Sequence, residues 1–129
     1  MYRAETEGVE VTVAPRFMEA ESDPAQGLYF WAYTVEIVNR SRRTLQLVSR
    51  HWVITDGRGQ VHEVRGEGVV GEQPVLKPGE RFEYTSGCPL TTPDGTMRGA
   101  YTMRGEGGDI EVAIPLFALD SPHVQKILH

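Results

Sequence analysis

Three glycines at the spacing G-x-G-x-x-G, in the segment from Gly66 to Gly71, carry the clearest chemical signature in this sequence. At the start of a helix, this spacing lets backbone N–H groups bind the pyrophosphate of a dinucleotide. The surrounding residues do not fit that use, because Pro74 follows closely and the next element is predicted to be a strand. We therefore do not expect a dinucleotide-binding βαβ unit.

The same glycines could bind phosphate without a helix, because consecutive backbone N–H groups in a turn can form a nest for an anion. The nearby charges oppose an uncomplexed polyphosphate. One arginine, Arg65, stands against Glu67 and Glu72, which leaves residues 65–72 with a net charge of −1. A nucleotide polyphosphate would need Mg²⁺ to offset the two carboxylates.

Two other interpretations of this segment stay open. The glycines could serve only a tight, irregular connection with positive φ between Val64 and Val75, at a point where the chain changes sheets. Alternatively, the segment could be an exposed recognition loop in which Val69 and Val70 contact a partner. The candidate ligand or partner loop consists of Arg65, Gly66, Glu67, Gly68, Val69, Val70, Gly71 and Glu72.

Catalytic chemistry has little support in the sequence. His51 and Trp52 are adjacent, so in a strand they face opposite ways, with Trp52 predicted in the core and His51 on the outer face. Ser49, His51 and Asp56 lack the spacing of a known nucleophile motif, and no G-x-S-x-G occurs. We predict no catalytic residue and expect a protein that is not an enzyme.

Metal binding has equally little support. There is no H-E-x-x-H, no cysteine pair and no acidic calcium loop, and the possible ligands are scattered. These ligands are His51, His62, Glu63, Cys88, His123 and His129. We predict no metal site and no cofactor, and we expect Cys88 to act as a small apolar side chain in the packing.

Charge sets limits on the partners. The chain has a formal net charge of −5, which phosphate backbones and anionic membrane surfaces would repel, so nucleic acid is not an expected partner. The one basic cluster, Arg40, Arg42 and Arg43 with Arg50 nearby, could contact an acidic partner or be the solvated end of a hairpin.

The length of 129 residues suits one domain, which we place at residues 1–129. No stretch approaches the roughly 18 apolar residues that a membrane-spanning helix needs, so membrane insertion is not expected. The single cysteine cannot form an intramolecular disulfide, and the first residues lack the features of a signal peptide. We therefore expect a cytoplasmic protein.

The first half of the chain has the apolar patterns of strands. Strands are predicted at residues 8–14 and at residues 28–38, the latter a long segment without glycine or proline that is expected to be central. A polar turn at residues 39–43 leads to a third strand at residues 44–55. The predicted buried faces are Val9, Val11 and Val13 in the first strand, and Val48, Trp52 and Ile54 in the third.

The second half continues in the same way, with turns at Asp56–Gly59, Pro78–Gly79 and Gly105–Asp109. Further strands are predicted at residues 61–64, 81–85, 97–103 and 110–114. Their expected inner faces include Phe82 and Tyr84 in one strand, and Met97, Gly99, Tyr101 and Met103 in another. The only expected helix is a terminal turn at residues 123–128. About seven short antiparallel strands predict an all-β sandwich of the immunoglobulin or fibronectin type III kind.

Several longer motifs resemble the ApaG family over nearly the whole chain. They are Ser49-Arg-His-Trp52, Ile54-Thr-Asp56, Gly66-Glu-Gly-Val-Val-Gly-Glu-Gln-Pro74, Leu76-Lys-Pro-Gly79, Tyr84-Thr-Ser-Gly87, Met97-Arg-Gly-Ala-Tyr-Thr-Met103 and Ile114-Pro-Leu-Phe-Ala-Leu119. The resemblance implies a fibronectin type III-like sandwich and a genetic association with cobalt resistance and magnesium efflux. It does not imply a transporter.

The resemblance also bears on partners. Related domains occur in F-box proteins and in a polymerase-interacting protein, settings that favour protein contacts. The family's glycine motif maps onto Gly66, Gly68 and Gly71, for which nucleotide or pyrophosphate binding has been proposed. We therefore expect a small, soluble, non-enzymatic binding domain whose sheet face or loop at residues 65–74 contacts another protein. The alternative is a protein that binds a nucleotide polyphosphate through that loop.

Overall fold

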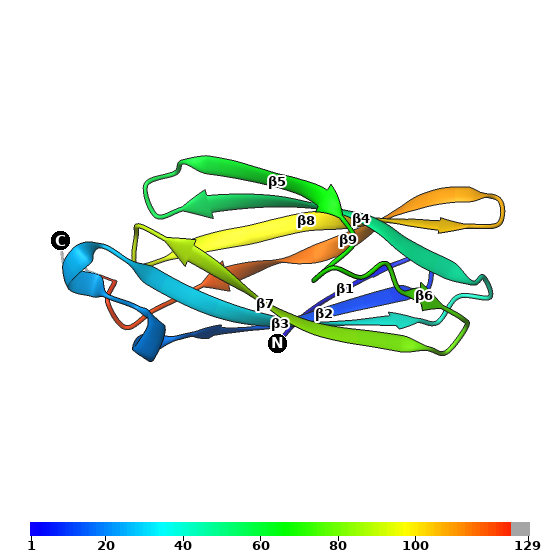
Figure 1. Cartoon of the computed structure of the whole chain (residues 1–129), viewed down its shortest axis with the longest axis horizontal. Helices are drawn as coiled ribbons and strands as arrows, with labels where there is room; N and C mark the ends of the chain where they lie inside the picture. The colour runs from blue at the N-terminus through cyan, green and yellow to red at the C-terminus, as the bar shows by residue number, and fades with distance from the viewer. Residues whose placement is uncertain (125–129) are drawn as a thin grey trace.

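The structure is a computed structural model that describes residues 1–124, and these residues form two antiparallel β-sheets (Figure 1). The strands are β1 (Tyr2–Thr6), β2 (Val9–Phe17), β3 (Tyr29–Asn39), β4 (Leu45–Asp56), β5 (Val61–Glu67), β6 (Val75–Leu76), β7 (Arg81–Leu90), β8 (Gly95–Gly105) and β9 (Gly108–Leu119). Two 3₁₀ turns, η1 (Glu19–Glu21) and η2 (Pro24–Gln26), lie between β2 and β3. The predicted all-β sandwich is confirmed.

Sheet one has the strand order β1-β2-β3-β7, and sheet two has the order β5-β4-β8-β9. The short strand β6 pairs with the first residues of β4, on the edge of β4 that β5 occupies farther along. No helix in the described part of the chain is long and apolar enough to cross a membrane.

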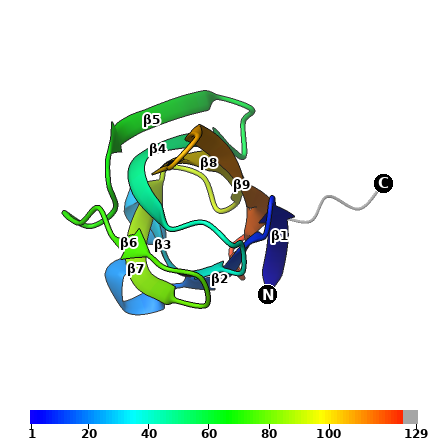
Figure 2. The ribbon, with the colours of Figure 1, turned by 90° about the vertical axis from the view of Figure 1, so that its right-hand side faces the viewer.

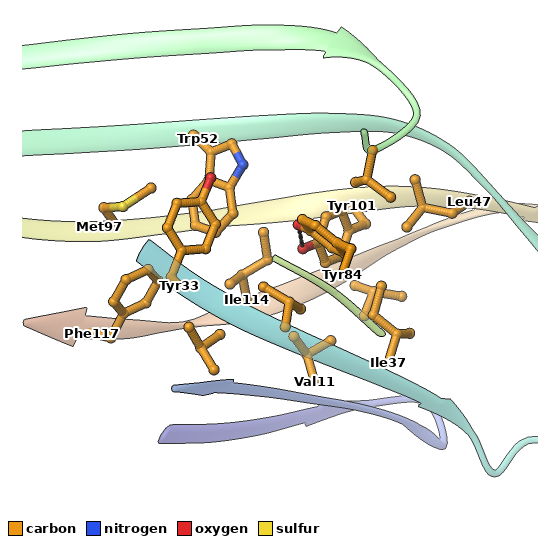
Figure 3. Packing of buried hydrophobic residues seen from close by; sticks show 14 of the residues in the cluster. Val11, Tyr33, Ile37, Leu47, Trp52, Tyr84, Met97, Tyr101, Ile114 and Phe117 are labelled. Carbon is orange, nitrogen blue, oxygen red and sulfur yellow. Dashed lines mark hydrogen bonds between the residues drawn. The ribbon is translucent and has the colours of Figure 1, made fainter. Parts of the chain in front are cut away.

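The core lies between the two sheets and is built from alternating residues of both. In β2, Val9, Val11 and Val13 are fully buried, as predicted, and β3 is central in its sheet. Figure 3 shows aromatic rings from both sheets meeting in this core, with Tyr33 of β3 packed against Trp52 and Phe117.

The face that β4 turns to the core changes at a β-bulge between Leu47 and Ser49. Before the bulge Leu45 and Leu47 are fully buried, so the prediction that Val48 lies on the inner face was wrong. After it, Trp52 is buried and Arg50 pairs with the buried Tyr101, which places Arg50 on the inner face too. The extra residue in the bulge causes this shift, because strand side chains alternate with a period of two.

Other differences from prediction concern strand ends. β1 was not predicted, and it forms because Glu7 and Gly8, both with positive φ, turn the chain back into β2. β9 continues past Pro115 to Leu119, with a register irregularity opposite Met97 and Gly99 that accommodates the proline. The helical turn predicted at residues 123–128 falls mainly on residues outside those described.

The sandwich is closed along one side and open along the other. On the closed side β1 lies beside β9, and the Thr6 hydroxyl accepts a hydrogen bond of 3.1 Å from the Ala113 N–H. On the open side the edge strands are β5 and β7, which lie apart in the end-on view of Figure 2. This difference positions the site described below.

A buried amide, Asn39 at the end of β3, joins four segments of the chain. Its Nδ2 donates to the carbonyls of Arg43 at 2.7 Å and Leu76 at 2.8 Å, and its Oδ1 accepts from the N–H of Ser41 at 3.0 Å. Its backbone carbonyl accepts from Gly79 at 2.6 Å. Asn39 therefore fixes both the turn after β3 and the connection from β6 to β7.

Replacing Asn39 with alanine would remove the side-chain donor to the buried Leu76 carbonyl and the acceptor of Ser41, while the Arg43 carbonyl would keep the Ser41 hydroxyl as a donor. We therefore expect Asn39→Ala to lower the free energy of unfolding by about 3 kcal/mol. Urea denaturation followed by tryptophan fluorescence would measure it. The exposed Thr44→Ala in the same turn should change stability by less than about 0.5 kcal/mol. Equal effects for the two variants would contradict the role given to Asn39.

Candidate functional site

A cleft of about 520 Å³ opens between the sheets on the side of β5 and β7, and we call it the open-edge cleft. From sheet two it is lined by Arg50, Trp52, Ile54, His62 and Val64, and from β7 by Tyr84, Ser86, Cys88, Pro89 and Leu90. Every residue of β5 is exposed except Gly66, and β5 is an edge strand of sheet two. The cleft therefore combines an apolar lining with two sheet edges at its mouth.

Arg50 is the charged group on the inner face of β4 at this cleft. Its Nη1 donates to the backbone carbonyls of Glu67 and Gly68, each at 2.9 Å. Its Nε and Nη2 make no hydrogen bond within residues 1–124 and are not sealed from solvent. Arg50 forms no ion pair with a carboxylate of the described residues.

The glycine loop, residues 65–74, has a structural reason for each of its three motif glycines. A Cβ on Gly66 would lie 2.8 Å from the guanidinium carbon of Arg50. Gly68 has a φ of 61°, and a Cβ there would collide with the carbonyl of Glu72. Gly71 has a φ of 80° in a tight turn. The expected irregular connection with positive φ is thus present at Gly68 and Gly71, whereas Gly66 makes room for Arg50.

The hydrogen bonds of the glycine loop keep it on the edge of β4. Gly68 N–H donates to the Val48 carbonyl at 2.8 Å, and Val69 and Glu72 exchange backbone hydrogen bonds of 2.8 and 2.9 Å. The chain passes to sheet one only after β6, so the suggestion that it changes sheets within this loop was wrong. Because three of the loop's N–H groups already have acceptors, fewer remain for an anion, and polyphosphate binding stays a prediction.

The two valines of the loop have different environments. Val69 is fully buried in the core, so the expectation that it contacts a partner was wrong. Val70 is 55% exposed at the tip, with a φ of 44° that is strained for a β-branched residue. Only Val70 offers an apolar surface to a partner.

Three tyrosines lie at the inner end of the cleft, beside Arg50. The hydroxyls of Tyr84 and Tyr101 hydrogen-bond to each other, as the dashed line in Figure 3 marks. Burial raises the pKa of Tyr33, Tyr84 and Tyr101, and the nearby Arg50 charge opposes this rise. These phenols therefore stay neutral at physiological pH.

The remaining candidates do not form a common site. His51 lies on the outer face of sheet two, as predicted, with its Nε2 2.8 Å from Glu63 Oε1. His62 lines the cleft, and His123 lies near Glu19. Within residues 1–124 no group of three or more His, Cys, Asp or Glu side chains is placed to hold a metal, and His129 lies outside the described residues.

The basic cluster is divided by the fold. Arg40 Nε lies 3.0 Å from Glu10 Oε1, and Arg43 donates to the carbonyl of Gly108 at 2.8 Å. Arg42 is exposed in the turn, while Arg50 faces the cleft. These four arginines, close in the sequence, thus have four different surroundings in the fold.

The fold and the cleft define a small two-sheet β-sandwich domain, closed along one side and opened along the other by an arginine-containing cleft. The chain belongs to the ApaG family, since the model of the ApaG domain matches residues 19–105. Protein ApaG of Methylorubrum populi is 63% identical over 130 residues, with all of both chains covered.

Solved structures agree with this assignment. A protein from Bordetella pertussis described as ApaA is 52% identical, with a TM-score of 0.86 over 96% of this chain and 100% of that one. A second crystal structure is 38% identical, with a TM-score of 0.83 over 95% of this chain and 93% of the other. The sandwich architecture described above is therefore that of the family.

The surroundings of the loop glycines predict how strongly each Gly→Ala substitution lowers the free energy of unfolding. We expect Gly71→Ala to cost about 1–2 kcal/mol, because only the left-handed backbone opposes a side chain there. Gly68→Ala should cost more than about 3 kcal/mol, because backbone collision adds to the same strain. Gly59→Ala, in an open turn with a φ of 82°, is the matched control for Gly71→Ala. Chemical denaturation would measure the order, and a Gly68→Ala variant as stable as Gly71→Ala would contradict it.

Cys88 is buried in the wall of the cleft, and burial raises the pKa of its thiol to about 11. Because the thiolate is the reactive form, we expect the folded protein at pH 8 to react with a disulfide reagent about 100-fold more slowly than the urea-unfolded chain. The absorbance of the released thiol would follow both rates. Equal rates would show that Cys88 is accessible and ionised in the fold.

Proposed function

We propose that this ApaG-family domain is a non-catalytic binding module that contacts another protein at the open-edge cleft. The observation that carries the proposal is the cleft itself, an apolar cavity of about 520 Å³ between two exposed sheet edges. Clefts of this size with a few polar groups are typical of binding sites.

The surroundings of the cleft support a protein as the occupant. β5 and β7 are sheet edges, and edge strands have backbone groups that another chain can pair with. Val64 and Val70 add exposed apolar surface at the mouth, at 41% and 55% exposure. A partner chain can therefore gain both backbone hydrogen bonds and apolar contacts here.

The chemistry of the cleft residues supports binding rather than turnover. The Cys88 thiol and the phenols of Tyr84 and Tyr101 have pKa values raised by burial, which keeps them protonated and weakly nucleophilic. His51 points away from them on the outer face, so it cannot act as their base.

The family association with cobalt resistance and magnesium efflux would then operate through a protein contact. In this proposal the domain binds a component of the metal-transport system or its regulator, and the cleft supplies the contact surface. Binding of the metal by the domain itself is not required.

Two matched valines on β5 allow a test. Val64 lines the cleft, whereas Val61, 58% exposed, does not. We expect Val64→Asp to abolish capture of the partner from native lysate, and Val61→Asp to retain it, because only the first places a charge in the apolar cleft. Quantitative mass spectrometry would compare the captured proteins, and thermal unfolding would check that both variants fold.

A third variant, Val70→Asp, tests the glycine loop, since aspartate tolerates the left-handed backbone that Val70 adopts. Loss of capture with Val70→Asp would include the loop in the contact surface. Identical partner sets for Val64→Asp and Val61→Asp, or no partner captured by the unmodified protein, would overturn the proposal.

A further inference from the structure

The open-edge cleft is bounded at both ends by chain connections. At the inner end, the glycine loop inserts the fully buried Val69 between the sheets, and the connection from β6 leads on to β7. At the other end, residues 91–94 carry the chain from β7 to β8, and Thr92 Oγ1 there accepts a hydrogen bond of 2.8 Å from Gly57 N–H. The cleft is therefore open along its side, between β5 and β7.

This shape restricts what can enter. A segment that continues in both directions would have to leave through the closed ends, so it can only cross the mouth. A chain end can enter from the side and stop inside. The shape thus favours a terminus over an internal segment.

The positive charge of Arg50 at the inner end of the cleft determines which chain terminus can bind there. Arg50 lies there, fixed by two hydrogen bonds to the carbonyls of Glu67 and Gly68, while its Nε and Nη2 remain free within the described residues. These two donors lie on one side of the planar guanidinium, the arrangement that binds a carboxylate through two hydrogen bonds. Although Glu67 also lines the cleft, the two free groups of Arg50 are donors only, so they match a carboxylate and not an amino group.

Apolar groups lie next to Arg50 in the cleft. Val64, two residues from the Gly66 against which the guanidinium lies, and Val70 of the glycine loop line the cleft on this side. An apolar side chain on the last residue of the entering chain would contact them while its carboxylate reaches Arg50. The edges of β5 and β7 are available to the residues that precede it.

We propose that the open-edge cleft binds the C-terminal carboxylate of a partner chain, with Arg50 holding the carboxylate and Val64 and Val70 contacting an apolar terminal side chain. The proposal rests on the proposed function, and it names the part of the partner that the cleft recognises.

Two peptide libraries would test it. The first displays random octapeptides at a free C-terminus, and the second displays the same octapeptides followed by a fixed Gly-Ser tail. We expect selection against the unmodified protein to enrich sequences with an apolar last residue from the first library only. A selected peptide should then bind at least 10-fold more weakly when its carboxylate is converted to an amide, as fluorescence polarisation would measure.

Two arginine variants provide the matched comparison. We expect Arg50→Gln to weaken binding of the free-acid peptide at least 10-fold and to remove the difference between acid and amide, whereas Arg65→Gln should leave both unchanged. Because Arg50 also holds the glycine loop, Arg50→Lys is included, and it should retain a measurable preference for the acid. Thermal unfolding would verify the fold of each variant.

The outcomes separate the two proposals. Equal affinity for acid and amide, or equal effects of Arg50→Gln and Arg65→Gln, would overturn carboxylate recognition. Enrichment from the tailed library as strong as from the free-terminus library would overturn it too, while leaving a peptide-binding cleft in place. Enrichment from neither library would contradict both carboxylate recognition and protein binding at the cleft.

Discussion

One extra residue in β4 determines which side chains of that strand face the opposite sheet. The bulge between Leu47 and Ser49 ends one inner face at Leu47 and begins another at Arg50. Without it, His51 and Val53 would point inward in place of Arg50 and Trp52. The core aromatic packing, the charge in the cleft and the position of the glycine loop all follow from this shift, because the loop is held by the carbonyl of the bulge residue Val48 and by the Arg50 side chain.

The same region explains how the two edges of the open side avoid uncontrolled pairing. β5 has charged residues at Glu63, Arg65 and Glu67, and β7 has Pro89, which lacks an N–H. Charges and proline are the devices that commonly protect exposed strand edges. The open side is thus restricted to partners that bring complementary groups.

Much of the fold was predictable from local patterns. The alternation of Val9, Val11 and Val13 and the glycines of the turn after Asp56 each act within a few residues, so their consequences appear in the sequence directly. The bulge at Val48 was not predictable in this way, because its hydrogen-bond partners Gly68 and Gln73 lie about 20 or more residues along the chain. Arg50 was therefore considered beside the basic cluster of Arg40, Arg42 and Arg43, although the bulge places it in the cleft.

In the glycine loop, too, the sequence predicted what depends on local residues and missed what depends on tertiary packing. The G-x-G-x-x-G spacing identified the segment, but it did not distinguish the buried Val69 from the exposed Val70, since that depends on tertiary packing. Cys88 as apolar packing and His51 on the outer face were predictable from residue type and strand alternation, and both are found.

The contact between β1 and β9 has a consequence for synthesis. Thr6 and Ala113 are separated by 107 residues in sequence, yet they are joined by a hydrogen bond along the closed side of the sandwich. During translation, the contact between β1 and β9 can form only after the residues of β9 have left the ribosome. Non-local pairing of this kind slows folding, because a long loop must close first. Until β9 is in place, the apolar faces of β1 and β2 that it covers stay exposed to solvent.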